Sequence, residues 1–169
     1  MNLQDISCQR CLTASGWLVR DYKILLVKHK MLGIWLAPGG HVELNELPHQ
    51  AAEREFLEET GVRVQAISAL PNLNAQETEF LPVPCLSNLH WINKPGEVKK
   101  VRKSTNTACE QHYVFGYFVK CVDACEIKNQ DDGIEDVRWF SLEEALELNT
   151  LLDVREEMKF VFANFPQEV

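Results

Sequence analysis

The chain has 169 residues, 46% of them apolar, and a formal net charge of −8 with an isoelectric point near 5.1. This length and composition predict one domain with its own hydrophobic core. The negative charge argues against binding to extended nucleic acid, which requires a basic surface. No stretch is apolar over the length of a membrane span, and the amino-terminal residues show no signal-peptide pattern, so we expect a cytoplasmic protein with no membrane partner.

The amino-terminal part of the chain predicts short strands that lead into a glycine turn. Residues 1–11 are expected to form a lead-in, and an apolar stretch follows at residues 13–20. Residues 23–28 (KILLVK) have the composition of a buried strand, and residues 34–36 predict a second, shorter one. Residues 38–40 (PGG) then indicate a turn.

A helix is predicted between Pro48 and Gly61. Proline is favoured in the first turn, where its missing N–H is not needed, and glycine commonly ends a helix. Asn45, just upstream, is the expected N-cap.

Three glutamates of this helix, Glu55, Glu58 and Glu59, stand at positions i, i+3 and i+4 and therefore share one face. Like charges at this spacing destabilise an isolated helix, whereas a bound cation reverses the sign of the interaction. Carboxylate oxygens on one rigid element suit Mg²⁺ or Mn²⁺. Arg54 lies one turn before Glu58 and is expected to pair with it. A solvated acidic helix face is the alternative interpretation.

The middle of the chain has weaker patterns. Residues 62–70 alternate and predict a strand, whereas residues 71–107 contain four prolines and predict a long loop or insertion. Four positive charges in this loop are candidate phosphate contacts, although basic loop residues are commonly just solvated: Lys99, Lys100, Arg102 and Lys103.

The last third predicts a central strand, a short strand and two helices. Residues 111–122 form the expected central strand, and residues 137–140 form the last one after an acidic loop at 129–136. Capping-box signatures that begin at Ser141 and Asp153 predict the two helices. The element order predicts a single α/β domain over the whole chain, with a mixed sheet between helical layers.

The six cysteines include one C-x-x-C pair, Cys8 and Cys11, and a second pair four residues apart, Cys121 and Cys125. A structural zinc site normally shows a second C-x-x-C or a spaced histidine pair, and no such pattern follows in the sequence. We therefore expect reduced, partly buried thiols.

The glutamates belong to a longer pattern that begins at Gly40. Five residues separate Gly40 from Glu46, and seven separate Glu46 from Arg54. The complete pattern resembles the Nudix box, the signature of a hydrolase family. Its fixed positions are all filled, by Gly40, Glu46, Arg54, Glu55, Phe56, Glu58, Glu59, Gly61 and Val62. Phe56 stands where an aliphatic residue is commoner.

The resemblance implies the Nudix fold, an α/β/α sandwich with a mixed β-sheet between helices. It also implies hydrolysis of a phosphoanhydride bond in a nucleoside diphosphate-linked compound, assisted by Mg²⁺ or Mn²⁺. The metal ligands that it implies are Glu55, Glu58 and Glu59, together with the carbonyl of Gly39, for which the carbonyl of Gly40 is the alternative. Glu55 is the first candidate for the general base, and Glu46 and Arg54 are expected to orient the helix and its carboxylates.

Some members of the family take an extra base or ligand from a loop after a late strand. Glu135 is the corresponding candidate in this chain, and Asp131, Asp132 and Asp136 are its rivals. For all four acids, exposure to solvent without a role is the alternative.

The resemblance leaves the substrate open. The proline and tyrosine markers of the ADP-ribose and dinucleoside polyphosphate branches are not matched, which favours a MutT-like (d)NTP pyrophosphohydrolase. A nucleotide-sugar or ADP-ribose pyrophosphatase is the alternative. A non-catalytic binding module is less favoured because the carboxylates are intact. The expected partner is a small nucleotide, and a homodimer is left open.

Overall fold

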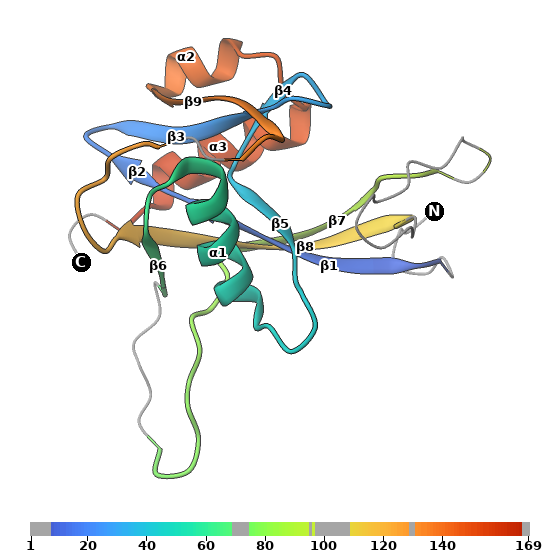
Figure 1. Cartoon of the computed structure of the whole chain (residues 1–169), viewed down its shortest axis with the longest axis vertical. Helices are drawn as coiled ribbons and strands as arrows, with labels where there is room; N and C mark the ends of the chain where they lie inside the picture. Colours follow the sequence, from blue (N-terminus) through green and yellow to red (C-terminus); the bar gives the residue numbers. More distant parts are fainter. Residues whose placement is uncertain (1–7, 69–74, 95, 97–108, 129–130, 167–169) are drawn as a thin grey trace.

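The computed structural model describes residues 8–68, 75–94, 96, 109–128 and 131–166 (Figure 1). In chain order these residues form β1 (Arg10–Trp17), β2 (Val19–Arg20), β3 (Lys23–His29), β4 (Ile34–Leu36), β5 (Gly39–His41), α1 (Pro48–Thr60), β6 (Val64–Ile67), β7 (Leu86–Trp91), β8 (Gln111–Cys121), β9 (Ile134–Phe140), α2 (Leu142–Glu147) and α3 (Leu152–Asn164).

The strands form two sheets (Figure 1). The larger sheet has the order β5-β1-β8-β6, and β7 also pairs with β8. It is mixed, because β1 and β8 are parallel while the other pairs are antiparallel. The smaller sheet is antiparallel and places β3 between β4 and β9, with β2 also paired to β3. β8 is thus the central strand that the sequence predicts.

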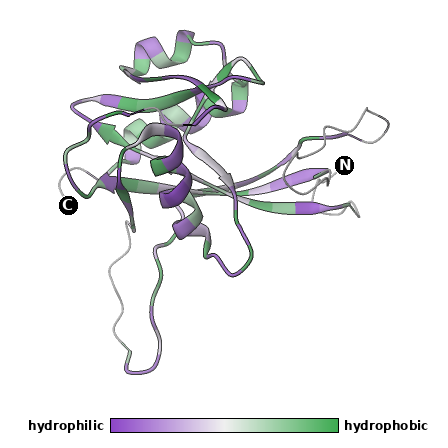
Figure 2. Ribbon diagram, in the orientation of Figure 1, coloured by the Kyte–Doolittle hydropathy of each residue, from purple (hydrophilic) through white to green (hydrophobic). Residues whose placement is uncertain are grey.

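Helices cover both sides of these strands. Successive side chains of β3 show this, because they point alternately to the two sides. Leu25 and Val27 pack into the core cluster that contains the buried face of α1. Ile24 and Leu26 point the other way, into the cluster that contains residues of α2 and α3. Figure 2 shows β3 as largely hydrophobic, whereas α1 is largely hydrophilic on its outer side. The predicted α/β/α arrangement is confirmed.

Three of the predicted segments contain more strand than expected. Leu86–Trp91, inside the predicted loop at 71–107, forms β7, and Arg10, inside the predicted lead-in, begins β1. Both stretches lack a clear alternation, and each becomes a strand because β8 offers an edge for it to pair with. Similarly, β9 begins at Ile134, within the predicted acidic loop.

The N-caps predicted at Asn45 and Asp153 are both wrong. The N-cap of α1 is Leu47, while Asn45 lies in the preceding turn with φ 67°. Pro48 explains this, because the residue before a proline is held out of the helical region and therefore ends up as the N-cap. Asp153 lies within the first turn of α3 rather than before it. The capping box of Ser141 is confirmed.

The expectation of reduced thiols is also wrong for four cysteines. Disulfides join Cys11 to Cys109 and Cys121 to Cys125, while Cys8 and Cys85 are free. The first bond links residues 98 positions apart, which the pairing of β1 with β8 brings together. A local spacing such as C-x-x-C cannot indicate such a partner.

Gly61 gives a test of the turn that ends α1. It has φ +72°, and a Cβ there would collide with the backbone of Lys128; Gly33 has φ +68° but open space around it. We expect Gly33→Ala to lower the free energy of unfolding by about 1 kcal/mol, the usual cost of a left-handed alanine. Gly61→Ala should cost about 3 kcal/mol, because the backbone must also shift. Equal losses in urea unfolding would contradict the predicted contact with Lys128.

Candidate active site

The position of α1 is fixed by its apolar face. Ala51, Ala52 and Phe56 are fully buried and pack in the core cluster with Ala14 of β1. The ring of Phe56 lies against Gly16, where a Cβ would overlap it. This absence of a side chain in β1 makes room for an aromatic residue at this point of the helix. The neighbouring stripe of glutamates consequently faces β5.

Glu59 is the most deeply buried of these glutamates. It is 7% exposed, and the Gly39 N–H donates a hydrogen bond to its Oε2 at 2.9 Å. Burial raises the pKa of Glu59 to about 8, against the effect of the Gly39 hydrogen bond, and the negative charges of Glu55, Asp131 and Glu58 add to the rise. Without a cation, the site therefore disfavours the charged form of this carboxyl group, which has little access to water.

Glu55 lies beside Glu59 and, like it, faces the glycines of β5. Burial raises its pKa, whereas the adjacent Arg54, whose Nη1 is 2.9 Å from Oε1, acts in the opposite direction. A Cβ at Gly40 would overlap the carboxylate of Glu55, so this close approach of helix and strand requires glycine. Glu58 is half-exposed and accepts a hydrogen bond from Arg54 Nη1 at 3.1 Å.

Arg54 connects the helix to the chain that precedes it. Its Nε and Nη2 donate to the two carboxylate oxygens of Glu46 at 2.8 and 3.0 Å, and Nη2 also donates to the carbonyl oxygen of His41 at 3.0 Å. The hydrogen bond from Arg54 lowers the pKa of Glu46. Glu46 in turn accepts the Glu43 N–H at 3.0 Å. One guanidinium thus fixes the entry turn, β5 and two glutamates of α1.

The arrangement fits a divalent cation. Glu55, Glu58 and Glu59 supply hard oxygen donors from one helix, and Arg54 offsets only part of their charge because Glu46 shares it. Gly39 is in contact with Glu59 through its N–H. The predicted contact of Arg54 with Glu58 is present, and Arg54 also contacts Glu46. The roles of all these residues as ligands, orienting groups or base stay predictions.

The candidate residues outside the box are placed differently. Glu135 lies in β9 and forms an ion pair with Lys28 of β3 at 2.8 Å. Asp131 is the loop acid whose charge acts on Glu59, and its Oδ1 accepts the Gly133 N–H. Of these two acids, Asp131 is the one whose charge acts on Glu59, while Glu135 is paired with Lys28, and a role for either stays a prediction. The predicted basic cluster lies outside the described residues: Lys99, Lys100, Arg102 and Lys103.

Comparison with known proteins gives first the class of fold and then the family. The structure resembles the crystal structure of a hydrolase of the NUDIX family from Clostridium perfringens, with a TM-score of 0.69 at 22% identity over 91% of this chain and 97% of that one. The NUDIX domain family matches residues 10–162. The chain therefore belongs to the Nudix family, whose enzymes generally use a divalent metal and act on small nucleotides.

Curated relatives are similar over shorter stretches. A probable DHNTP pyrophosphohydrolase from Lactococcus lactis is 28% identical over 132 residues, which is 78% of this chain and 63% of that protein. A putative 8-oxo-dGTP diphosphatase from Bacillus subtilis is 51% identical over 52 residues, 31% of this chain and 34% of that protein. The chain thus spans between about a third and two thirds of the length of these relatives.

Within the described residues, no helix is both long and apolar enough to cross a membrane. The cytoplasmic location expected from the sequence stays a prediction.

Arg54→Lys tests whether the guanidinium holds the site together. Lysine keeps the charge but cannot bind both oxygens of Glu46 and the His41 carbonyl at once. We expect the free energy of unfolding in urea to fall by about 2 kcal/mol, because Glu46 loses its bidentate hydrogen bonds. The exposed Arg63 is the control, since Arg63→Lys should change stability by less than about 0.5 kcal/mol. A stable Arg54→Lys variant would contradict this role.

Proposed function

We propose that the protein is a MutT-like pyrophosphohydrolase that uses Mg²⁺, or Mn²⁺, to hydrolyse nucleoside triphosphates to a monophosphate and pyrophosphate. The observation that carries the proposal is the convergence of Glu55, Glu58 and Glu59 on one side of α1, against the glycines of β5. Carboxylates are buried together at this density where a cation compensates their charge.

The residues divide into ligands and supports. Glu55, Glu58 and Glu59, with the carbonyl of Gly39, are the proposed ligands. When bound, the cation neutralises charge on the anhydride oxygens and makes water a stronger nucleophile near neutral pH. Glu55 is the proposed base, because burial raises its pKa and so suits it to accept a proton. Arg54 holds Glu55 and Glu58 in place through contacts of 2.9 and 3.1 Å.

The choice of a triphosphate rests on the absence of the other branches' markers and on the relatives. The Bacillus subtilis relative is named for 8-oxo-dGTP, a nucleoside triphosphate, and the Lactococcus lactis relative is named a pyrophosphohydrolase. Nucleotide sugars or ADP-ribose are the alternative substrates. A homodimer is neither required nor opposed by the geometry of the site, which one chain supplies.

A phosphate-release screen tests the proposed activity. Purified protein with Mg²⁺ and separately with Mn²⁺ would be given normal and oxidised (d)NTPs, ADP-ribose, nucleotide sugars and dinucleoside polyphosphates. Coupled pyrophosphatase or phosphatase would report the products. We expect turnover of one or more triphosphates with release of pyrophosphate. Cleavage of diphosphate-linked compounds alone would instead select the alternative, and silence on the whole panel would contradict hydrolysis of these compounds.

Glu59→Gln tests whether Glu59 is a metal ligand or only supports one. The amide can still accept the Gly39 N–H but cannot ionise, so it removes a carboxyl group whose charged form is disfavoured by burial and by the charges of Glu55 and Asp131. We expect turnover to fall by more than the roughly 10–100-fold typical of groups that only support a ligand. Without metal at neutral pH, the melting temperature should rise, since the amide is buried without the cost of protonating or desolvating a carboxylate.

The matched control is Glu147→Gln, which changes an exposed glutamate at the end of α2. It should leave both turnover and melting temperature close to those of the unchanged protein. Unaltered turnover in Glu59→Gln would show that the metal lies elsewhere.

A further inference from the structure

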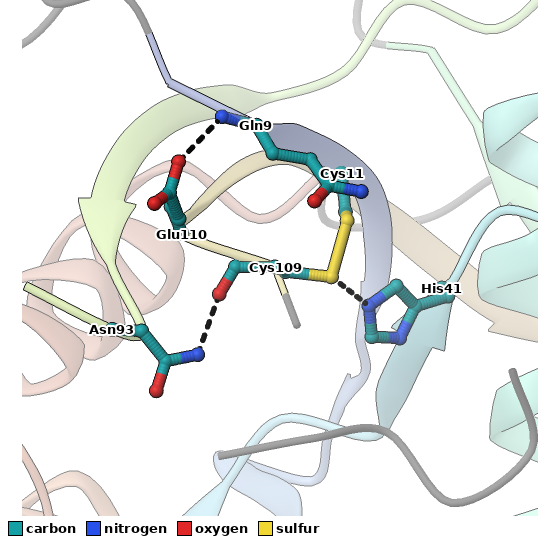
Figure 3. Close-up of a disulfide and its surroundings, with 6 residues drawn as sticks. All are labelled: Gln9, Cys11, His41, Asn93, Cys109 and Glu110. Atoms are coloured by element: carbon teal, nitrogen blue, oxygen red, sulfur yellow. Dashed lines mark hydrogen bonds between the residues drawn. A yellow bond between two sulfur atoms is a disulfide. The ribbon is translucent and has the colours of Figure 1, made fainter. Parts of the chain in front are cut away.

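A second set of side chains that could hold a metal ion lies outside the glutamates of α1 (Figure 3). Cys11, His41 and Cys109 each present one ligand atom, and these atoms lie within 4.8 Å of one another. The Nε2 of His41 is 3.3 Å from the Sγ of Cys109. The two cysteines are joined as a disulfide, and the imidazole of His41 points at it (Figure 3).

The backbone brings these residues together independently of the sulfur–sulfur bond. Cys11 lies in β1, opposite His112 of the parallel strand β8. Cys109 precedes β8, and its carbonyl oxygen accepts a hydrogen bond from Asn93 Nδ2 at 2.6 Å (Figure 3). Asn93 is itself only 2% exposed. The next residue, Glu110, donates its N–H to the Gln9 carbonyl at 3.0 Å. Sheet pairing and a buried amide therefore fix both cysteines.

The donor set suits a different metal from that of the glutamates. Two sulfurs and one imidazole nitrogen are soft or borderline ligands, which favour Zn²⁺ over Mg²⁺. With Zn–S near 2.3 Å and Zn–N near 2.0 Å, tetrahedral geometry places sulfur and nitrogen about 3.5 Å apart. The observed 3.3 Å between His41 and Cys109 is close to this value.

The fourth position of a tetrahedral site has a protein candidate beside it. The ring centroid of His112 is 4.8 Å from that of His41, and His112 shares the face of the sheet with Cys11 through their direct pairing. Structural zinc sites usually have four protein ligands, so His112 is the residue that would close this one. The C-x-x-C spacing of Cys8 and Cys11 in the sequence does not find this set, because the second sulfur comes from Cys109.

We propose that Cys11, His41 and Cys109 in their reduced form bind Zn²⁺ in a structural site distinct from the Nudix glutamates. Two equivalents of a small thiol reduce the Cys11–Cys109 bond to two thiols and are themselves oxidised to a disulfide. Each cysteine thiol then releases its proton to solvent, and Zn²⁺ takes both thiolates and the Nε2 lone pair of His41. The two forms, disulfide and zinc-bound, are alternatives for the same residues.

The site would act on the glutamates through β5. His41 directly follows Gly39 and Gly40, and its carbonyl oxygen accepts a hydrogen bond from Arg54. A metal bound to His41 would attach this short strand to β1 and to the start of β8, in addition to its three-residue pairing with β1. A metal bound there would reach the glutamate site only through the backbone of β5, and its ligands would not touch the substrate.

A cobalt titration of the whole protein tests the proposal. The protein would be reduced with an excess of a small thiol, the thiols counted, and the thiol removed without air. Excess Mg²⁺ would then occupy the glutamates. We expect about one equivalent of Co²⁺ to produce a thiolate-to-metal charge-transfer band and the visible bands of a tetrahedral site, and Zn²⁺ to abolish them. Neither readout depends on hydrolase activity, so failure of the zinc proposal can be told apart from failure of the proposed function.

Variants identify the ligands. Cys11→Ser should remove most of the charge-transfer intensity, and His41→Gln should weaken Co²⁺ binding by about 10-fold or more. Cys85→Ser is the matched control, because Cys85 is a partly buried cysteine with a free thiol whose Sγ donates to the Gly116 carbonyl; it should leave the titration unchanged. His41→Gln serves if Cys11→Ser fails to fold.

Three outcomes would overturn the proposal. One is reduced protein with all its thiols counted but no charge-transfer band. Another is a band that persists in Cys11→Ser or that disappears in Cys85→Ser. The third is a Cys11–Cys109 disulfide that excess thiol leaves intact, since the ligands would then never form.

Discussion

The bidentate pair between Arg54 and Glu46 is the interaction on which the glutamate site depends. Glu46 comes from the turn before α1 and Arg54 from its middle, so the pair sets how the chain enters the helix. The same guanidinium reaches the carbonyl of His41 and two glutamates of the site. A single side chain thus links strand, turn and helix, and its five donors make this possible where a lysine has only three.

The sequence predicts the helix and its acids well because local rules determine them. Pro48 and Gly61 bound α1 as expected, since each acts on its own backbone, through fixed φ and through a left-handed cap. The spacing of Glu55 and Glu59 places both on one side of a helix wherever that helix packs. The pairing of Arg54 with Glu58 follows from the same geometry.

Long-range contacts explain what the sequence could not reveal. Leu86–Trp91 becomes a strand only because β8 has an edge free to receive it, and no alternation in these residues announces that partner. The pairing of Cys11 with Cys109 depends in the same way on the register of β1 and β8. Asn45 has the chemistry of an N-cap but loses that position to Leu47 because Pro48 acts on its neighbour's backbone. In each case a partner elsewhere in the fold, or the backbone, overrides the local signal.

β6 and β7 both pair with β8, so the sheet does not depend on the chain that connects these two strands. Ile67 of β6 lies opposite Phe118 and Leu86 of β7 lies opposite Gly116, so the connection leaves and rejoins β8 at almost the same point. Residues 75–85, the described part of this connection that leads into β7, extend away from both sheets (Figure 1). Its length can consequently change in evolution by many residues at small entropic cost and with no shift of strand register. Relatives of this chain could gain or lose whole loops here while α1 stays where it is.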